Sequence, residues 1–302
     1  MAERVEPPRG KAERAHRVNG ASAVVVDYDA GPFLPDCVRS LVDEGVEELI
    51  VVENGDADAA RATLDAHGLE KTPLLATGRN LGYGAGANRG LAAIERGEHV
   101  VVCNPDLVVH PGAVDRLAST LDDHPAWAIV GPRVLTPDGR AYPSARQFPA
   151  PWVAAGHALL GLAFPNNSFT RRYRTPDLPE RPTEVEWVSG AFFLARRSVL
   201  DEVGGFDEGY FMFAEDMDLC WRIGRAGWKI GFDPDAVVTH HEGISRRHHP
   251  YRMALAHHRS ALLFASRTTS GPRRVLLPLA ALGLGVRLVA IWLSMLARRA
   301  RS

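Results

Sequence analysis

Acidic side chains are missing from the last part of this sequence. Residues 246–302 contain eleven Arg residues and no Asp or Glu, whereas the whole chain has a formal net charge of -1. The rest of the chain is therefore acidic. A purely basic segment favours anionic partners such as lipid headgroups, nucleic acid or a phosphate-bearing substrate. We expect no nucleic acid partner, because the segment has no recognised reading motif and its longest element is apolar.

Cysteine is also scarce. Cys37, Cys103 and Cys220 lie far apart, in patterns typical of a helix, a strand end and a helix. This spacing argues against a disulfide framework and indicates reduced, buried thiols. Six of the twelve His residues lie between positions 240 and 258. No Cys or carboxylate at a fixed spacing accompanies them, which argues against a structural zinc site.

The apolar stretch of a signal peptide is absent from residues 1–20, which mix Pro, Glu, Arg and Lys. We interpret these residues as a disordered lead-in, and we expect the body of the chain to stay in the cytoplasm.

One long apolar run is present at residues 275–297, where only Arg287 and Ser294 interrupt it. A spanning helix needs about 20 apolar residues, but an Arg is costly at the centre of a bilayer. A spanning helix, a helix in the membrane interface and a helix packed on protein therefore all remain open.

The remaining pattern predicts an α/β fold. The chain has 302 residues, of which 46% are hydrophobic, so it can bury a large core. Short apolar runs at 22–28, 48–54, 99–106 and 127–131 alternate with helical patterns. Such alternation favours a mostly parallel, Rossmann-like sheet with helices on both faces. Ligands of these sheets bind beyond the carboxyl ends of the strands.

Polar side chains follow three of the predicted strands, namely Asp27, Glu53 with Asn54, and Asn104 with Asp106. Any one of them can simply cap a helix or close a turn. Asp106 is poorly placed as a cap, because the next helix begins several residues later, near Pro111. A carboxylate there can hold magnesium or manganese beside substrate phosphates. The glycines of residues 79–90 permit a nucleotide to approach the backbone, although such turns also arise for steric reasons alone.

Residues 211–228, FMFAEDMDLCWRIGRAGW, place acidic residues where an apolar helix face begins. If the helix begins near Ala214, Asp216 shares that apolar face, and Asp218 faces Arg222 one turn later. We expect the Asp218–Arg222 pair to be solvated. Acids favour the first helical turn, but this preference does not require an acid on the apolar face. Burial there would raise the pKa of Asp216 towards the range of a general base.

Seven segments in order resemble the family 2 glycosyltransferases of the GT-A fold: VVVDY, VVEN, NLGYGAGANRG, NPD, WVSGAFFLARR, GGFDEGYFMFAEDMDLCWRIGRAGW and VVTHHEGIS. The sequence looks most like bacterial rhamnosyltransferases that act on lipid-linked cell-wall intermediates. The resemblance implies a catalytic domain at 21–265, with a nucleotide-binding half at about 21–135 and an acceptor half at about 136–265. Membrane-associated helices at 266–302 would follow, on the cytoplasmic face of the cell membrane.

The resemblance also implies roles for individual residues. The donor nucleotide is expected at Asp27, Glu53, Asn80, Gly82, Asn104 and Arg259. The acceptor and sugar are expected at Trp187, Gly190, Asp207 and Glu215. Asp216 would be the general base, and a divalent cation, magnesium or manganese, would bind Asp106 with His240 or, alternatively, His241. Two departures from the family pattern are Glu53, where Asp is usual, and residues 256–260, where an Asn-Arg pair is common.

The implied activity is inverting, metal-dependent transfer of L-rhamnose from dTDP-L-rhamnose to a polyprenyl-diphospho-N-acetylglucosamine acceptor in cell-wall polysaccharide synthesis. Galactofuranosyl, mannosyl and glucosyl transfer use the same motifs. A nucleotidyltransferase or metal-dependent phosphohydrolase would not need Asp216. A non-catalytic glycan-binding domain would need neither Asp106 nor Asp216. The inner face of the membrane and a second copy in a homodimer complete the expected partners.

Overall fold

The computed structural model describes residues 20–148, 164, 166–168, 178–241 and 250–299. The predicted disordered lead-in, apart from Gly20, lies outside the described residues. So does part of the predicted acceptor half.

The described residues contain one large sheet and one small one. The strands of the large sheet are β1 (Ala21–Asp27), β2 (Glu48–Glu53), β3 (Leu74–Ala76), β4 (His99–Cys103), β5 (Leu107–Val109), β6 (Trp127–Leu135), β7 (Ala141–Tyr142), β9 (Thr183–Val185), β11 (Phe192–Arg196) and β12 (Lys229–His240). In the small sheet, β8 (Ala145–Arg146) pairs with β10 (Trp187–Val188).

The strand order of the large sheet is β3-β2-β1-β4-β11-β6-β12-β5, with β7 and β9 paired off this path. Strands β3, β2, β1 and β4 are parallel to their neighbours, and β12 is parallel to β6. Strand β11 is antiparallel to β4 and β6 and therefore joins the two parallel parts. The predicted alternation of strands and helices is confirmed for the parallel half, and the antiparallel insertion was not anticipated.

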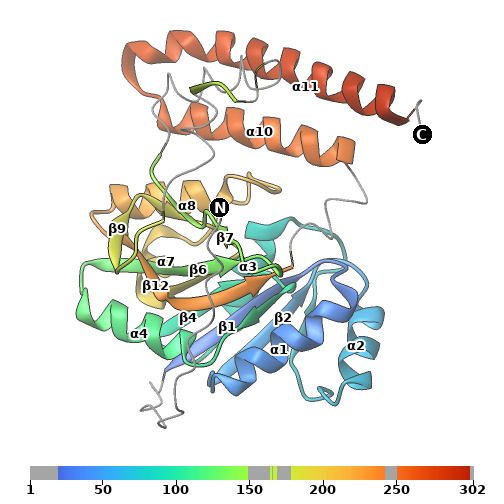
Figure 1. The fold of residues 1–302 in the computed structure, drawn as a ribbon, viewed down its shortest axis with the longest axis vertical. Coiled ribbons are helices and arrows are strands. Elements are labelled where there is room, and N and C mark those ends of the chain that lie inside the picture. The colour runs from blue at the N-terminus through green and yellow to red at the C-terminus, as the bar shows by residue number, and fades with distance from the viewer. Residues whose placement is uncertain (1–19, 149–163, 165, 169–177, 242–249, 300–302) are drawn as a thin grey trace.

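Helices cover both faces of this sheet (Figure 1). The helices are α1 (Leu34–Asp43), α2 (Ala57–Ala66), α3 (Tyr83–Ala93), α4 (Ala113–Asp123), α7 (Arg197–Val203), α8 (Glu215–Arg225), α10 (Pro250–Thr268) and α11 (Leu277–Arg299), with short 3-10 turns η1 (Gly31–Phe33) and η2 (Gly271–Leu276). Along β1, Ala23 and Val25 pack with α1 and α4, whereas Val24 and Val26 pack with α3. Burial on both faces explains why β1 reads as a continuous apolar run.

The three cysteines lie in α1, β4 and α8, and all are buried and free. The prediction of reduced, buried thiols is confirmed.

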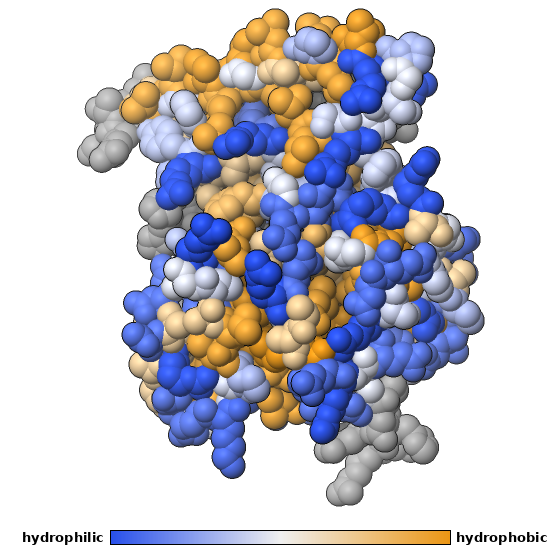
Figure 2. Space-filling view, turned by 180° about the vertical axis from the view of Figure 1, so that it is seen from behind, coloured by the Kyte–Doolittle hydropathy of each residue, from blue (hydrophilic) through white to orange (hydrophobic). Residues whose placement is uncertain are grey.

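Helices α10 and α11 lie side by side at one end of the molecule (Figure 1). Helix α10 lies between α11 and the sheet-containing body. The space-filling view from behind shows apolar residues gathered at this end, over α11 (Figure 2).

Candidate active site

Asp106 and His240 meet because β5 and β12 are antiparallel neighbours, with Leu107 opposite His240. The His240 Nε2 atom lies 2.9 Å from Asp106 Oδ1, and Asn104 Nδ2 lies 3.3 Å from the same Nε2. Both Asp106 and His240 are buried. His241 differs, because its backbone N–H donates to the Asp106 carbonyl while its ring packs on Phe33. The structure therefore places the side chain of His240, and not that of His241, on Asp106.

The residues around Asp106 fit the predicted divalent cation. The Nδ1 atom of His240 is buried and has no hydrogen-bond partner among the described residues. Within those residues, no group of three or more His, Cys, Asp and Glu side chains is arranged to hold a metal ion. A magnesium or manganese ion that also binds substrate phosphates needs only one or two protein carboxylates, and Asp106 can supply one of them.

Asp27 and Glu53 form a second buried acidic pair. They end β1 and β2, and the parallel register puts them side by side. Both are 2% exposed. Burial, reinforced by the hydrogen bond to Asp27, raises the pKa of Glu53 to about 9. Burial also raises the pKa of Asp27. The pair therefore retains a proton near neutral pH and offers both a donor and an acceptor at the carboxyl end of the sheet.

The glycine-rich turn begins α3 and packs against the loop that precedes α8. Gly82 has a φ of +90°, and a Cβ built there would lie 2.1 Å from the carbonyl oxygen of Phe211. The backbone N–H of Tyr83 donates to that same oxygen at 3.1 Å. Asn80 accepts from the Gly82 N–H at 2.9 Å. Only glycine permits this approach, which joins two predicted site segments far apart in the sequence.

Helix α8 begins at Glu215, close to the predicted start near Ala214. The two preceding residues, Phe213 and Ala214, have φ values of 69° and 63°. Non-glycine residues rarely adopt this left-handed conformation, and such strain clusters at functional sites.

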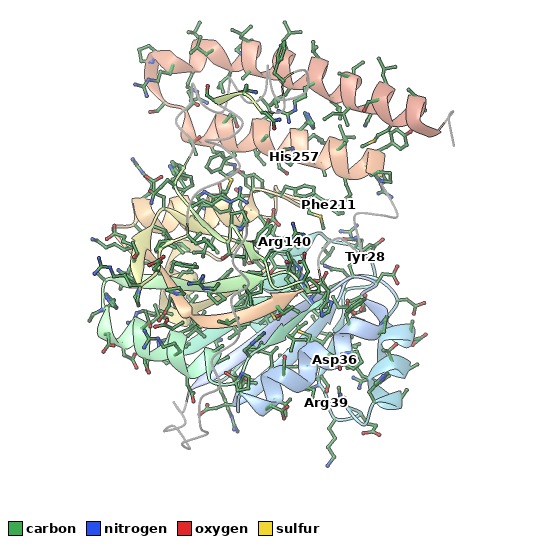
Figure 3. The ribbon with its side chains drawn as sticks, in the orientation of Figure 1. Tyr28, Asp36, Arg39, Arg140, Phe211 and His257 are labelled. Atoms are coloured by element: carbon green, nitrogen blue, oxygen red, sulfur yellow. The ribbon has the colours of Figure 1, made fainter. Side chains whose placement is uncertain are left out.

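Helix α10 packs on this strained turn. Ser260 Oγ donates to the Met212 carbonyl at 2.8 Å, and the ring of His257 packs against Phe213. Figure 3 shows His257 beside the loop that contains Phe211.

Asp216 is half-buried, and each of its two carboxylate oxygens accepts one backbone hydrogen bond. Its Oδ2 atom accepts from the Gly190 N–H and its Oδ1 atom from the Met217 N–H, each at 2.8 Å. Burial raises the pKa of Asp216, and these hydrogen bonds and the charge of Arg146 oppose the rise. The predicted direction of the pKa shift is confirmed.

Glu215 precedes Asp216, and its carboxyl group lies in a different environment. It is 7% exposed, and its Oε2 atom has no hydrogen-bond partner among the described residues. Burial, and then the charge of Asp216, raises the pKa of Glu215 to about 8. Near neutral pH Glu215 is therefore the protonated member of the pair.

Gly190 links the glycine-rich turn to Asp216. The hydroxyl of Tyr83 donates to the Gly190 carbonyl, while the N–H of Gly190 donates to Asp216. A Cβ at Gly190 would lie 3.2 Å from the Cβ of Asp216. Tyr83 was not among the predicted site residues. Tyr83 could have been recognised in the sequence as an aromatic residue within a turn that otherwise consists mostly of small residues.

Trp187 lies on β10 opposite Arg146 of β8. The Arg146 guanidinium carbon is 5.2 Å from the centre of the Trp187 ring, and the Trp187 Nε1 atom is buried without a partner among the described residues. Arg146 was also missed, because it falls in the irregular stretch that follows residue 140. The positive charge of Arg146 acts on Asp216 and opposes the rise that burial causes in its pKa.

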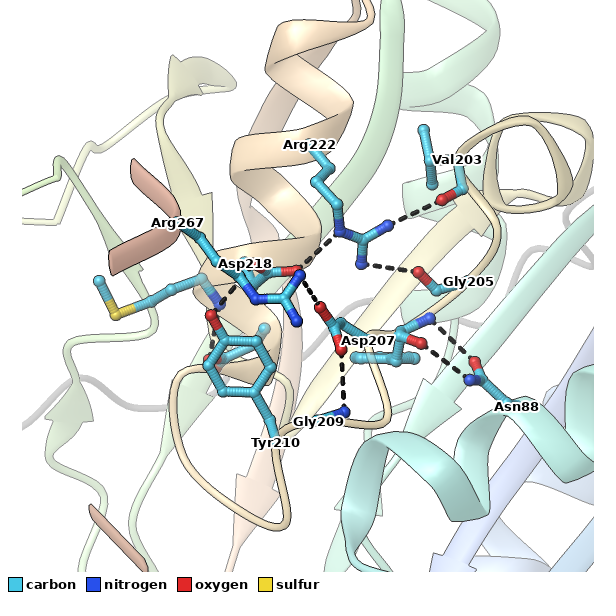
Figure 4. A network of polar contacts seen from close by, with 12 residues as sticks. Asn88, Val203, Gly205, Asp207, Gly209, Tyr210, Asp218, Arg222 and Arg267 are labelled. Carbon is cyan, nitrogen blue, oxygen red and sulfur yellow. Dashed lines mark hydrogen bonds and ion pairs between the residues drawn. The ribbon is translucent and has the colours of Figure 1, made fainter. Parts of the chain in front are cut away.

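Asp207 and Asp218 belong to a polar network beneath the site (Figure 4). Asp207 pairs with Arg267 of α10 and accepts from the Gly209 N–H. Asp218 does pair with Arg222, at 2.7 Å, but it is 0% exposed and also accepts from the Tyr210 hydroxyl. The prediction that this pair is solvated is wrong, because the loop before α8 folds over it.

Arg259 is exposed on α10. Among the described residues, no hydrogen bond or ion pair joins it to the other predicted donor residues. The structure therefore brings Asp27 together with Glu53, and it brings Asn104 and Asp106 together with His240. Within the described chain, Arg259 contacts neither group.

Comparison with known proteins identifies relatives over most of the chain. The family model described as "Glycosyltransferase like family 2" matches residues 19–261. The chain is 38% identical over 261 residues to N-acetylglucosaminyl-diphospho-decaprenol L-rhamnosyltransferase of Mycobacterium tuberculosis (strain ATCC 25618 / H37Rv), covering 82% of this chain and 84% of the relative. It is 32% identical over 159 residues to a pre-mycofactocin glycosyltransferase of the same organism, covering 53% of this chain and 30% of the relative.

Solved structures share the fold. The mannosyltransferase PcManGT from Pyrobaculum calidifontis, in complex with GDP-Man and Mn2+, aligns with a TM-score of 0.54 and 16% identity, over 93% of this chain and 79% of that one. GalNAc-T7 with UDP, GalNAc and Mn2+ aligns with a TM-score of 0.55 and 16% identity, over 74% of this chain and 44% of that one. The predicted GT-A fold is confirmed.

Proposed function

The chain belongs to glycosyltransferase family 2, and from this premise we propose that it transfers L-rhamnose from a nucleoside diphosphate to a polyprenyl-diphosphate-linked N-acetylglucosamine at the cytoplasmic face of the membrane. The sugar and the acceptor are inferred from the relative that is 38% identical over most of both chains. We take dTDP-L-rhamnose as the donor and inversion at the anomeric carbon as the stereochemical outcome.

The observation that carries the proposal is the pair of hydrogen bonds at Gly190. One connects this peptide to Tyr83 in the glycine-rich turn, and the other connects it to Asp216. A donor bound at that turn would therefore lie beside a carboxylate held in a fixed orientation. A nucleotide-binding or hydrolytic protein has no need of this second carboxylate.

The donor nucleotide would bind at the carboxyl end of the parallel strands. Asp27 and Glu53 would hydrogen-bond its base and ribose, because their shared proton lets one donate while the other accepts. Asn80 and Gly82 would hold the turn against which the diphosphate lies. Asp106 and His240 would hold the cation, which when bound neutralises charge on the diphosphate, and Asn104 beside them would bind the donor nucleotide.

In the transfer step, Asp216 would accept the proton of the acceptor hydroxyl as that oxygen bonds to the anomeric carbon. The bond from the anomeric carbon to the donor phosphate oxygen breaks, and the nucleoside diphosphate leaves with the electron pair. A raised pKa makes Asp216 a stronger base than an exposed Asp. Protonated Glu215 would spare the acceptor a second negative charge beside the leaving group. Trp187 and Gly190 would lie around the acceptor, and Asp207 would hold the neighbouring loop through its ion pair with Arg267.

The experiment that tests this proposal is a donor panel. The full-length enzyme is incubated with a short-chain polyprenyl-diphospho-N-acetylglucosamine and, separately, with dTDP-rhamnose, UDP-galactofuranose, GDP-mannose and UDP-glucose. We expect product from dTDP-rhamnose alone, loss of product with EDTA, and recovery with added Mg2+ or Mn2+. Product from another donor only would overturn the rhamnosyl assignment, and full activity in EDTA would overturn the cation site.

A further inference from the structure

One side of α11 exposes a continuous apolar surface, which we call the outer stripe. It consists of Leu279, Leu282, Val286, Val289, Leu293 and Leu296, each more than half exposed. These residues recur at intervals of three and four, so they lie along one side of the helix. The segment Gly271–Ala297 is long and apolar enough to cross a membrane, and no residue of its most apolar window is fully buried within the described chain. Figure 2 shows this end of the molecule as predominantly apolar.

The opposite side of α11 packs on α10. The Trp292 Nε1 atom donates to the Tyr251 carbonyl at 3.3 Å. Arg287 is half-buried on this inner side, and its charge acts on His258 of α10. The central Arg is therefore turned away from the outer stripe. In the sequence, Arg287 lies in the middle of an apolar run. In the structure, it lies on the side of α11 that faces α10.

This arrangement favours one orientation of the helix at a membrane. A spanning α11 would leave α10 and carry Arg287 into the hydrocarbon, which is costly. In the structure α11 instead runs alongside α10, which is held to the body by the Ser260–Met212 hydrogen bond and the Arg267–Asp207 ion pair. A helix lying flat buries an apolar face only to the depth of the headgroup boundary.

The charge around the outer stripe matches a lipid surface. Arg273 and Arg274 are exposed at its beginning, and residues 246–302 contain no acidic side chain. Basic residues that flank an apolar helix face favour anionic lipid headgroups. A second copy of this chain would instead bring like charges together.

We propose that α11 lies in the plane of an anionic membrane interface, with the outer stripe among the acyl chains and Arg273 and Arg274 at the headgroups. The inference deepens the proposed function, on which it rests for the presence of a lipid-linked acceptor. The proposal also places the site relative to the membrane. Helix α10 packs on α11 and also contacts the turn that precedes Asp216. The base therefore lies one helix away from the bilayer surface.

Vesicle flotation tests the surface. Full-length enzyme is mixed with phosphatidylcholine vesicles that contain or lack phosphatidylglycerol. We expect flotation with the anionic vesicles, and a loss of about ten-fold or more in partitioning for Val286→Asn with Leu293→Asn, because the bound state buries both side chains. Val42→Asn removes an exposed Val from α1 and is the matched control. Equal partitioning of the double variant and the wild type would overturn the proposal.

Depth measurements distinguish lying flat from spanning. Fluorophores are attached to Leu279→Cys, Val286→Cys or Leu296→Cys, since the three native cysteines are buried. Similar, shallow quenching by labelled lipids at all three positions is expected. Deep quenching at 286 with shallow quenching at 279 and 296 would show a span.

A doubled mass in light scattering that the double variant abolishes, without vesicle binding, would assign the stripe to a dimer. Transfer to the short-chain acceptor is measured separately, so failure of the membrane surface and failure of the enzyme activity are distinguishable.

Discussion

At the scale of single residues, Glu215 and Asp216 show how neighbouring carboxyl groups acquire different roles. Asp216 accepts two backbone hydrogen bonds, which stabilise its charged form. Glu215 has a buried oxygen without a partner among the described residues, so burial disfavours its charge. Local hydrogen bonding therefore favours the ionised form of Asp216 and the protonated form of Glu215.

Tyr83 offers a test of how Asp216 is positioned. In Tyr83→Phe the Gly190 carbonyl loses its donor, and an unpaired buried carbonyl costs about 1–3 kcal/mol. We expect kcat to fall by about ten-fold with the KM for the donor nearly unchanged, because the peptide that orients Asp216 is loosened. Steady-state kinetics provide the measurement, with Tyr251→Phe on α10 as control. A lowered melting temperature with unchanged kcat would make Tyr83 purely structural.

The buried acids also predict a pH dependence of stability. The pKa of Glu53 is raised to about 9 and that of Glu215 to about 8, both from 4.5. Since the folded state then binds more protons than the unfolded state, the free energy of unfolding falls as pH rises from about 4.5 through these values, by up to about 1.4 kcal/mol per pH unit for each group.

Urea unfolding at about pH 5.5 and about pH 8.5 measures this slope. Glu53→Gln and Glu215→Gln should each flatten it, because the amide does not titrate. The exposed Glu70→Gln is the matched control. A wild-type stability that rises over this range would contradict the assignment of protons to the two buried acids.

At the scale of elements, the close contact between the glycine-rich turn and the loop before α8 holds the two parts of the site together. A side chain at Gly82 would overlap the Phe211 backbone. In Gly82→Ala we therefore expect a loss of stability and of donor binding greater than the strain of a side chain at positive φ alone, which costs about 1–3 kcal/mol.

Gly78→Ala isolates that strain, because Gly78 has a φ of +73° and no atom within 4 Å of the Cβ that would be added. Calorimetric donor binding and melting temperatures provide the comparison. Equal effects of the two substitutions would show that the close approach is unimportant.

The sequence predicted elements better than the contacts between them. The apolar runs predicted β1, β2, β4 and β6, and the acids in FMFAEDMDLC predicted where α8 begins. The burial of Asp218 was not predictable, because the covering Tyr210 lies outside the helix whose periodicity was analysed. The link from Tyr83 to Gly190 joins residues 107 positions apart, which helical or strand periodicity does not encode.

At the scale of the whole molecule, the choice between His240 and His241 depended on sheet topology. His240 is the last residue of β12, and the antiparallel pairing of β12 with β5 brings its ring to Asp106, whereas His241 follows the strand. Arg259 is the converse case. The resemblance implied a phosphate contact, but α10 holds Arg259 exposed and without an ion-pair partner in the described chain.

The whole molecule also explains why the apolar run at 275–297 was ambiguous. From composition alone, the charge of Arg287 argues against membrane contact. In the structure, α11 packs on α10, and Arg287 faces the protein. The sheet-containing body, α10 and α11 form successive layers (Figure 1).

We propose that Asp216 is the general base of a glycosyl transfer, and the initial transfer rate of Asp216→Asn at saturating dTDP-rhamnose and short-chain lipid acceptor tests this role. We predict a loss of about 10²–10⁴-fold, with a folded protein and unchanged donor affinity by calorimetry. Asp36→Asn, which alters an exposed Asp of α1, should keep the wild-type rate. A folded Asp216→Asn enzyme that transfers rhamnose at the wild-type rate would contradict the account.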